Sequence, residues 1–336
     1  MKPVTDIVEV AQRVADDVLF PAALATDASD TVPGELLDAL AGAGLYGLPA
    51  PRELGGLDAD FGTVCTVLEA LASGCLATAF LWMQHNGVVH ALTADGRPEV
   101  ARTWLPPLAA GQLRAGLALG GALPRPTLRA EPDGQGWRLD GVSPFVSGWG
   151  RIDVIHAAAR ATDGEIVWLL VDAAEGPALR AERLRLAALD ATATVTLGFD
   201  RLPVPADRVT SKHPPGDRAS PEVLRIHAAL ALGVTARCCR MLGPTSLDGE
   251  LTELRTELDK LGPGTAAARA AAGELALRAA AAVMTAAGSR SLLVTEHGQR
   301  LAREALFTLV YGLRPDSRSA LLALLKGAGE AGGTPS

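Results

Sequence analysis

The 336-residue sequence is poor in aromatic residues and in cysteine. Only 4% of its residues are Phe, Trp or Tyr, whereas its 48% hydrophobic and 21% charged residues are ordinary for a globular protein and disfavour general disorder. Its four cysteines (Cys65, Cys75, Cys238 and Cys239) include no C-x-x-C pair, which disfavours a zinc ribbon or a redox motif. Cys238 and Cys239 are adjacent in a predicted helix, where a disulfide between them would be strained. We interpret all four as reduced core residues.

The sequence also lacks an excess of positive charge and long apolar runs. Its 31 basic and 38 acidic residues give a net charge of -7, which disfavours binding to nucleic acid or to an anionic membrane. No uninterrupted apolar run approaches the roughly 20 residues of a bilayer span. The first 17 residues contain acids where a secretion signal needs bases. We therefore expect a cytoplasmic protein with neither a nucleic-acid nor a membrane partner.

Several common catalytic and ligand-binding motifs are missing too. The sequence has no G-x-x-x-x-G-K-[ST] phosphate loop and no G-x-S-x-G nucleophile elbow. Its six histidines form no pair at the three- or four-residue spacing of a helical metal clamp, so we expect no metal site. Residues 42–47 do match G-x-G-x-x-G, but they end a predicted helix instead of joining a strand to a helix. We interpret them as a helix stop.

What the sequence contains is a hydrophobic period that changes twice. Residues 1–112 follow a helical period, and residues 113–210 consist of short, partly alternating segments between Gly, Pro and Asp turns. The helical period returns over residues 218–328, where Ser220 and Pro221 are typical of an N-cap and a first helical residue. The predicted fold class is α+β: an N-terminal all-α domain, a middle antiparallel β sandwich or barrel, and a C-terminal four-helix bundle.

The individual elements follow from the same periods. Predicted helices cover 61–91, 97–110, 266–287, 299–313 and 317–325, with another that begins at Pro33; predicted strands cover 136–141, 152–159, 166–172 and 192–199.

Two features of the sequence are candidate ligand contacts: an aromatic–hydroxyl pair and a histidine in an apolar helix. Phe145 and Ser147 are two residues apart on a predicted strand and share a face, so that a flat ring could stack on the aromatic and bond the hydroxyl. An ordinary buried strand can carry the same pair. His85 interrupts an apolar helix and either faces a ligand or is a hydrogen-bonded core histidine.

Five strings, in this order, resemble the acyl-CoA dehydrogenase family. They are residues 45–56 (LYGLPAPRELGG), 104–111 (WLPPLAAG), 136–141 (GWRLDG) with 145–147 (FVS), 199–205 (FDRLPVP) and 299–305 (QRLAREA).

The resemblance implies a flavin enzyme that holds FAD between the β domain and the bundle. It implies oxidation of the Cα–Cβ bond of an acyl thioester, bound to CoA or to a carrier protein, by a homodimer or homotetramer. Phe145 and Ser147 match the family's aromatic and hydroxyl beside the flavin ring. Leu119 and Gly120 fall in the loop after the first strand and would offer backbone groups to the flavin.

The sequence departs from the family pattern at the catalytic base. The family's Tyr-Glu-Gly-Thr string corresponds best to Tyr311-Gly312-Leu313-Arg314, which has no carboxylate. Some relatives carry the base on the first bundle helix, where Glu222 is the candidate; the alternative is an acid favoured by the helix dipole. The family's Thr-Glu-Pro loop and Arg-x-Gln-Phe-Gly string are not found, and the bundle is shorter than usual.

Three functions are therefore open on this fold. The first is an FAD-dependent dehydrogenase of acyl thioesters. The second is a flavin-dependent monooxygenase, which needs no base for an α proton. The third is a catalytically silent paralogue that binds an acyl group or stabilises a partner.

Overall fold

The computed structural model describes residues 4–216 and 220–327, which fall into two compact units. One unit contains residues 25–64 and 77–216 together with the first helix up to residue 14. The other contains residues 15–24, 65–76 and the chain from 220 onward. The N-terminal helices thus contribute to both units. The division into domains 1–112, 113–210 and 218–328 stays an interpretation, and its boundaries at 1, 218 and 328 lie outside the described residues.

The N-terminal helices begin and end largely where the sequence predicts. α3 follows Pro33 and ends at Gly42, and Gly44 has a φ of 76°, a left-handed conformation that stops a helix. This confirms the interpretation of residues 42–47 as a helix stop. The predicted helix over 61–91 is two helices that break at Cys75. The helices are α1 (Val4–Val14), α2 (Phe20–Asp27), α3 (Gly34–Gly42), α4 (Phe61–Gly74), α5 (Leu76–Ala94) and α6 (Pro98–Ala109), with a π-helix η1 (Ala15–Leu19) between the first two.

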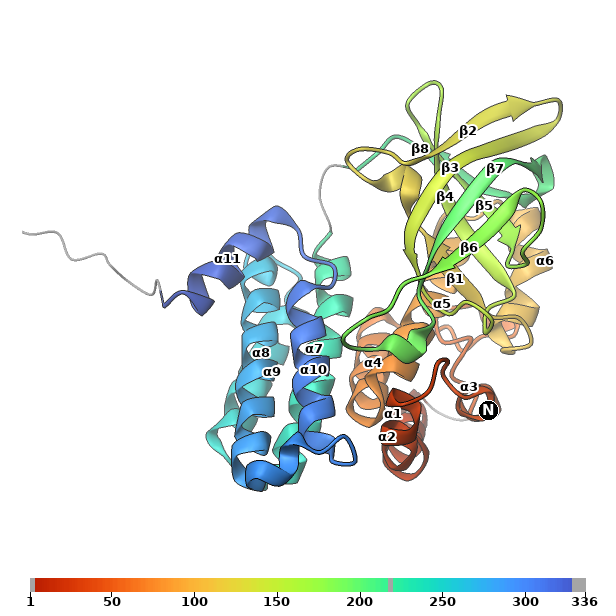
Figure 1. Cartoon of the computed structure of the whole chain (residues 1–336). Coiled ribbons are helices and arrows are strands. Elements are labelled where there is room, and N and C mark those ends of the chain that lie inside the picture. The colour runs from red at the N-terminus through yellow and green to blue at the C-terminus, as the bar shows by residue number, and fades with distance from the viewer. Residues whose placement is uncertain (1–3, 217–219, 328–336) are drawn as a thin grey trace, which may run out of the picture. The chain divides into compact units, whose positions relative to one another are not determined.

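An eight-stranded sheet follows (Figure 1). Its strands are β1 (Ala115–Ala118), β2 (Leu128–Asp133), β3 (Gly136–Val146), β4 (Val154–Ala161), β5 (Ile166–Asp172), β6 (Leu179–Arg183), β7 (Val195–Pro205) and β8 (Val209–His213). They pair in the order β6-β7-β3-β2-β4-β5-β8, and β1 also pairs with β4.

The sheet is mixed, which corrects the expectation of a wholly antiparallel one. β1 and β2 each pair with β4 in parallel, whereas the other pairs are antiparallel. Short alternating segments indicate strands but carry no information on strand direction, so the sequence could not reveal the parallel pairs.

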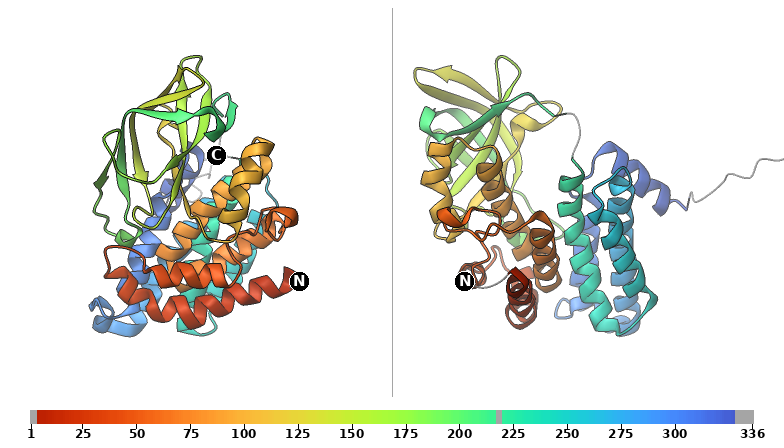
Figure 2. Two further views of the ribbon diagram at one scale, coloured as in Figure 1. Left: turned by 90° about the vertical axis from the view of Figure 1, so that its right-hand side faces the viewer. Right: turned by 180° about the vertical axis from the view of Figure 1, so that it is seen from behind.

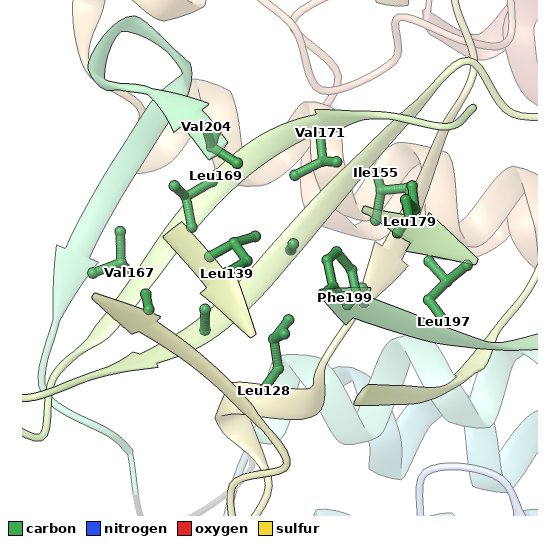
Figure 3. Close-up of a cluster of buried hydrophobic side chains, with 14 of the residues drawn as sticks. Leu128, Leu139, Ile155, Val167, Leu169, Val171, Leu179, Leu197, Phe199 and Val204 are labelled. Carbon is green, nitrogen blue, oxygen red and sulfur yellow. The ribbon is translucent and has the colours of Figure 1, made fainter. Parts of the chain in front are cut away.

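The two faces of the sheet are buried by different partners. On one face Leu139, Leu169 and Phe199 point toward one another in the space that the strands enclose (Figure 3). On the other face Val154 and Leu170 pack with side chains of α5 and α6. Because both faces of β4 are covered, this strand is a nearly continuous apolar run.

The second unit is built on the predicted bundle. Its helices are α7 (Pro221–Leu242), α8 (Ser246–Asp259), α9 (Thr265–Ala287), α10 (His297–Val310) and the shorter α11 (Pro315–Leu325). In both figures of the whole chain, α7 to α10 run alongside one another (Figures 1 and 2). The Ser220 side chain accepts a hydrogen bond from the Val223 amide, and Pro221 is the first helical residue. The predicted cap is confirmed.

α9 with the following 3-10 turn is long and apolar enough to cross a membrane by length and composition. The sequence shows no uninterrupted apolar run here, because Arg269, Glu274 and Arg278 lie among the apolar residues of the helix. In this unit the helix packs against α7, α8, α10 and α11, and it carries the buried Arg269. We therefore interpret it as the central helix of the bundle.

Candidate functional site

Phe145 is the most unusual residue of the sheet. It lies near the end of β3, and its side chain is 69% exposed although it is large and apolar. Its φ is 57°, in the left-handed region that a bulky residue rarely adopts. Such a conformation costs roughly 1–3 kcal/mol and tends to occur at ligand sites. The exposed, strained aromatic that the sequence singled out is therefore a candidate surface for a ligand.

Ser147 lies two residues further on, just beyond the end of β3, and begins a chain of buried hydroxyl groups. Its Oγ lies 2.7 Å from Oγ1 of Thr194, which lies 2.8 Å from Oγ1 of Thr192. The Thr192 hydroxyl donates to the carbonyl oxygen of Leu189 at 2.7 Å. All three hydroxyl residues are buried, Ser147 being the most accessible at 7%.

The loop that supplies the two threonines is itself strained. Leu189 and Ala193 flank a 3-10 turn, η4 (Asp190–Thr192), and both have a left-handed φ, of 58° and 49°. The Gly148 amide donates to the Thr192 carbonyl at 2.6 Å, which ties the end of β3 to this turn. No pattern in the sequence pointed to Thr192 or Thr194, because both fall in the ordinary strand predicted over 192–199.

Leu119 and Gly120 occupy the turn after β1. The Leu119 side chain is 43% exposed. Gly120 is buried, and its amide donates to Oγ of Ser143 at 3.1 Å while its carbonyl accepts from the Thr127 amide at 2.9 Å. A hydrogen bond from the Gly120 amide to a ligand would have to replace the bond to Ser143. The assignment of Leu119 and Gly120 as cofactor contacts stays a prediction.

In the bundle unit, the turn after α10 packs on His227 of α7. Gly312 has a φ of 65°, and a Cβ atom there would overlap Nδ1 of His227. The His227 ring also meets the edge of Tyr311, with ring centroids 4.9 Å apart, and Tyr311 stacks on Phe307. Burial, then Arg269 and Arg314, lowers the pKa of His227 to about 3, so the ring is neutral at pH 7.

Glu222 lies in the first turn of α7 and is exposed. Hydrogen bonding to Ser220 lowers the pKa of its carboxyl group. A lowered pKa makes a carboxylate a weaker base, and an acid in a first helical turn is also stabilised by the helix dipole. Its catalytic role stays a prediction.

Glu69 of α4 is a buried carboxylate of this unit that the sequence did not reveal. Its two oxygens accept from Nη2 of Arg225 at 2.8 Å and from Nε of Arg255 at 2.7 Å. Because both oxygens are paired with guanidinium groups, Glu69 is a structural acid rather than a base poised for proton transfer.

His85 is a core residue by its contacts. Its Nδ1 accepts from the Ala115 amide at 3.1 Å, its ring meets the edge of Tyr46, and burial lowers its pKa to about 3. Within residues 4–216 and 220–327, no three His, Cys, Asp or Glu side chains gather as metal ligands would.

Part of the chain matches a known family domain, and longer stretches resemble curated proteins. Residues 4–112 match the model of the acyl-CoA dehydrogenase N-terminal domain. The chain is 26% identical over 219 residues to 3-sulfinopropanoyl-CoA desulfinase of Paraburkholderia xenovorans, covering 61% of this chain and 55% of that protein. It is 32% identical over 238 residues to L-evernosamine nitrososynthase of a Micromonospora species, covering 65% and 52%. The chain thus spans about half the length of these curated relatives.

Solved structures share the fold along nearly the whole chain. The glutaryl-coenzyme A dehydrogenase glutaryl-CoA complex has a TM-score of 0.80 at 18% identity, over 100% of this chain and 98% of that one. Dibenzothiophene monooxygenase from Paenibacillus sp. A11-2, in complex with FMN and indole, has a TM-score of 0.76 at 16% identity, over 96% and 98%. Residues 4–112 thus form an acyl-CoA dehydrogenase N-terminal domain, and the whole chain has the fold of the solved acyl-CoA dehydrogenases.

Proposed function

We propose that the protein is a flavin-dependent oxidoreductase whose flavin ring lies on the surface presented by Phe145 and Ser147. The observation that carries this proposal is the exposed Phe145 in a strained conformation, two residues before the first member of a buried hydroxyl chain. Strain in a bulky aromatic is retained where the side chain has a task that a relaxed conformation would not serve.

These residues fit the chemistry of a flavin. An exposed aromatic ring offers a face or edge to a planar heterocycle, and Ser147 offers a hydroxyl oxygen to its polar edge. A bound flavin would supply two-electron chemistry to the substrate. The FMN in the similar monooxygenase structure supports a flavin, and the family resemblance favours FAD as its form.

For the reaction we propose α,β-dehydrogenation of an acyl thioester, linked to CoA or to a carrier protein. The CoA thioesters named for the desulfinase and the glutaryl-CoA dehydrogenase complex support this substrate class. Glu222 is the carboxylate proposed to take the α proton. Its side chain is exposed to solvent, and its hydrogen bond to Ser220 lowers the pKa of the carboxyl group.

A second candidate is oxygenation by a flavin-dependent monooxygenase, and the Gly312–His227 contact favours it. The resemblance places the usual base at position 312, but His227 fills the space that any side chain there would need. A reaction that needs no α-proton base at this position is compatible with that packing. The nitrososynthase and the dibenzothiophene monooxygenase among the similar proteins support the same alternative.

The experiment is anaerobic and aerobic turnover of the FAD-loaded protein. Reduction of an artificial electron acceptor by acyl-CoA substrates without oxygen, abolished in Glu222→Gln, supports dehydrogenation. Product formation that needs both oxygen and reduced flavin, unchanged in Glu222→Gln, supports oxygenation. A protein that retains no flavin would leave the silent paralogue as the better account.

We also propose a homodimer or homotetramer. Three apolar side chains of the bundle unit, Leu292, Val294 and Val310, are 70%, 81% and 71% exposed, as expected of residues covered by another copy. Light scattering on the eluting protein tests this, and a monomeric mass at micromolar concentration would contradict it.

A further inference from the structure

The hydroxyl chain at Ser147 has a fixed direction. The Leu189 carbonyl can only accept a hydrogen bond, so the Thr192 hydroxyl must donate its single hydrogen to it. In the contact between Thr192 and Thr194, the donor must then be Thr194.

The same argument applies to the next contact. Because Thr194 donates its single hydrogen to Thr192, Ser147 must be the donor in its contact with Thr194. The hydrogen of Ser147 therefore points into the domain. The oxygen of Ser147 has only lone pairs left for a ligand.

We propose that Thr192 and Thr194 are positioning residues that make Ser147 a hydrogen-bond acceptor, so that the site binds reduced flavin more tightly than oxidised flavin. The inference rests on the proposed flavin site and requires N5 to be the ring atom that faces Ser147, because the hydrogen-bonding role of N5 reverses on reduction. Two-electron reduction adds a hydrogen to N5, which turns this atom from an acceptor into a donor. An acceptor-only serine matches the reduced form and faces a lone pair in the oxidised form.

The surroundings keep the chain in this direction. Thr192 and Thr194 are 1% and 2% exposed, so water does not compete for their hydroxyls. The left-handed conformations of Leu189 and Ala193 hold the turn that presents the Leu189 carbonyl to Thr192. The Gly148 amide, bonded to the Thr192 carbonyl, fixes that turn to the strand that carries Ser147.

The test compares the dissociation constants of oxidised FAD under air and of dithionite-reduced FAD without oxygen. Thr194→Val removes the acceptor of the Ser147 hydrogen. Thr192→Val removes the group that fixes the direction but does not touch Ser147. In both variants Ser147 becomes free to donate outward, and we expect the preference for reduced FAD to fall about fivefold to tenfold. A tenfold fall lowers the two-electron midpoint potential of bound FAD by about 30 mV.

Two controls separate direction from packing. Thr194→Ser keeps the hydroxyl and should keep the wild-type ratio. Thr210→Val removes another buried threonine hydroxyl of the same sheet, bonded to His156, and should leave the ratio unchanged. Each variant is compared with wild-type protein only after its unfolding curve has been shown to be cooperative, which indicates that the variant is folded.

The possible outcomes are distinct. If wild-type protein binds FAD but Thr192→Val leaves the ratio of the two dissociation constants unchanged, the inferred direction of the hydroxyl chain is wrong. This holds even if Thr194→Val changes the ratio, since that change would then come from packing. A wild-type protein with no preference for reduced FAD also overturns the inference. If neither form of FAD binds, the proposed function fails, and the inference fails with it.

Discussion

His227 of α7 and Gly312 of the turn after α10 pack so closely that no side chain fits at position 312. A Cβ atom there would overlap Nδ1 of the imidazole, and its distance to Cε1 would be 2.6 Å. Gly312 also has a left-handed φ of 65°. The glycine at the position of the family's base is therefore required by the packing of this bundle.

The first prediction concerns this packing. Gly312→Ala should lower the free energy of unfolding by about 2 to 5 kcal/mol, from backbone strain and from the overlap with His227. Gly134→Ala is the matched control, because Gly134 has a similar φ of 60° with open space around it. It should cost only about 1–2 kcal/mol. In a His227→Ala background, the cost of Gly312→Ala should fall to the control value; an unchanged cost in denaturant titrations would refute the overlap.

The second prediction concerns the strain at Phe145. Phe145→Gly should raise the free energy of unfolding by about 1 kcal/mol, because glycine adopts the left-handed conformation freely and little buried area is lost. The same change should weaken FAD binding, measured by fluorescence titration. Val142→Gly on the same strand has no left-handed φ to relieve and should destabilise the protein by about 1 kcal/mol. Loss of stability in Phe145→Gly with unchanged FAD affinity would contradict the proposed role.

The third prediction concerns Glu69. Glu69→Gln leaves the buried Arg225 without its buried carboxylate and should cost about 3–5 kcal/mol in urea titrations. Asp259→Asn removes the other partner of Arg225, whose side chain is 57% exposed, and should cost no more than about 1 kcal/mol. Equal costs for the two variants would show that burial does not set the strength of these ion pairs.

The fourth prediction is a pH dependence. Burial lowers the pKa of His156 to about 3, below the 6.5 of an unfolded chain. Above pH 6.5 the ring is neutral in both states. Below it, the unfolded state binds a proton that the folded state excludes, so this ring alone lowers stability by up to about 1.4 kcal/mol per pH unit. His156→Gln should remove roughly 1.6 kcal/mol of the loss between pH 6.5 and 5.0, whereas parallel pH profiles would argue against a buried neutral ring.

The sequence predicted what depends on local chemistry. The cap at Ser220 and the helix stop after Gly42 both follow from residue types at short spacings. It could not predict contacts between distant segments. The pairing of Ser147 with Thr194 and of His227 with Gly312 joins residues 47 and 85 positions apart, and no local pattern encodes either.

The same limit applies to strand direction and to buried charge. The parallel pairing of β1 and β2 with β4 depends on which strands meet, not on their own alternation. In the sequence, Glu69 is an ordinary acid of a helix. Its ion pairs depend on Arg225 of α7 and Arg255 of α8, which lie far from it along the chain.

The most direct test of the proposed function is an absorbance spectrum of the protein after incubation with FAD and gel filtration, with oxidised and with reduced cofactor. We predict that flavin co-elutes with wild-type protein, more strongly when loaded in the reduced form, and that Phe145→Gly retains less. Wild-type protein that elutes without flavin under both conditions would contradict the account.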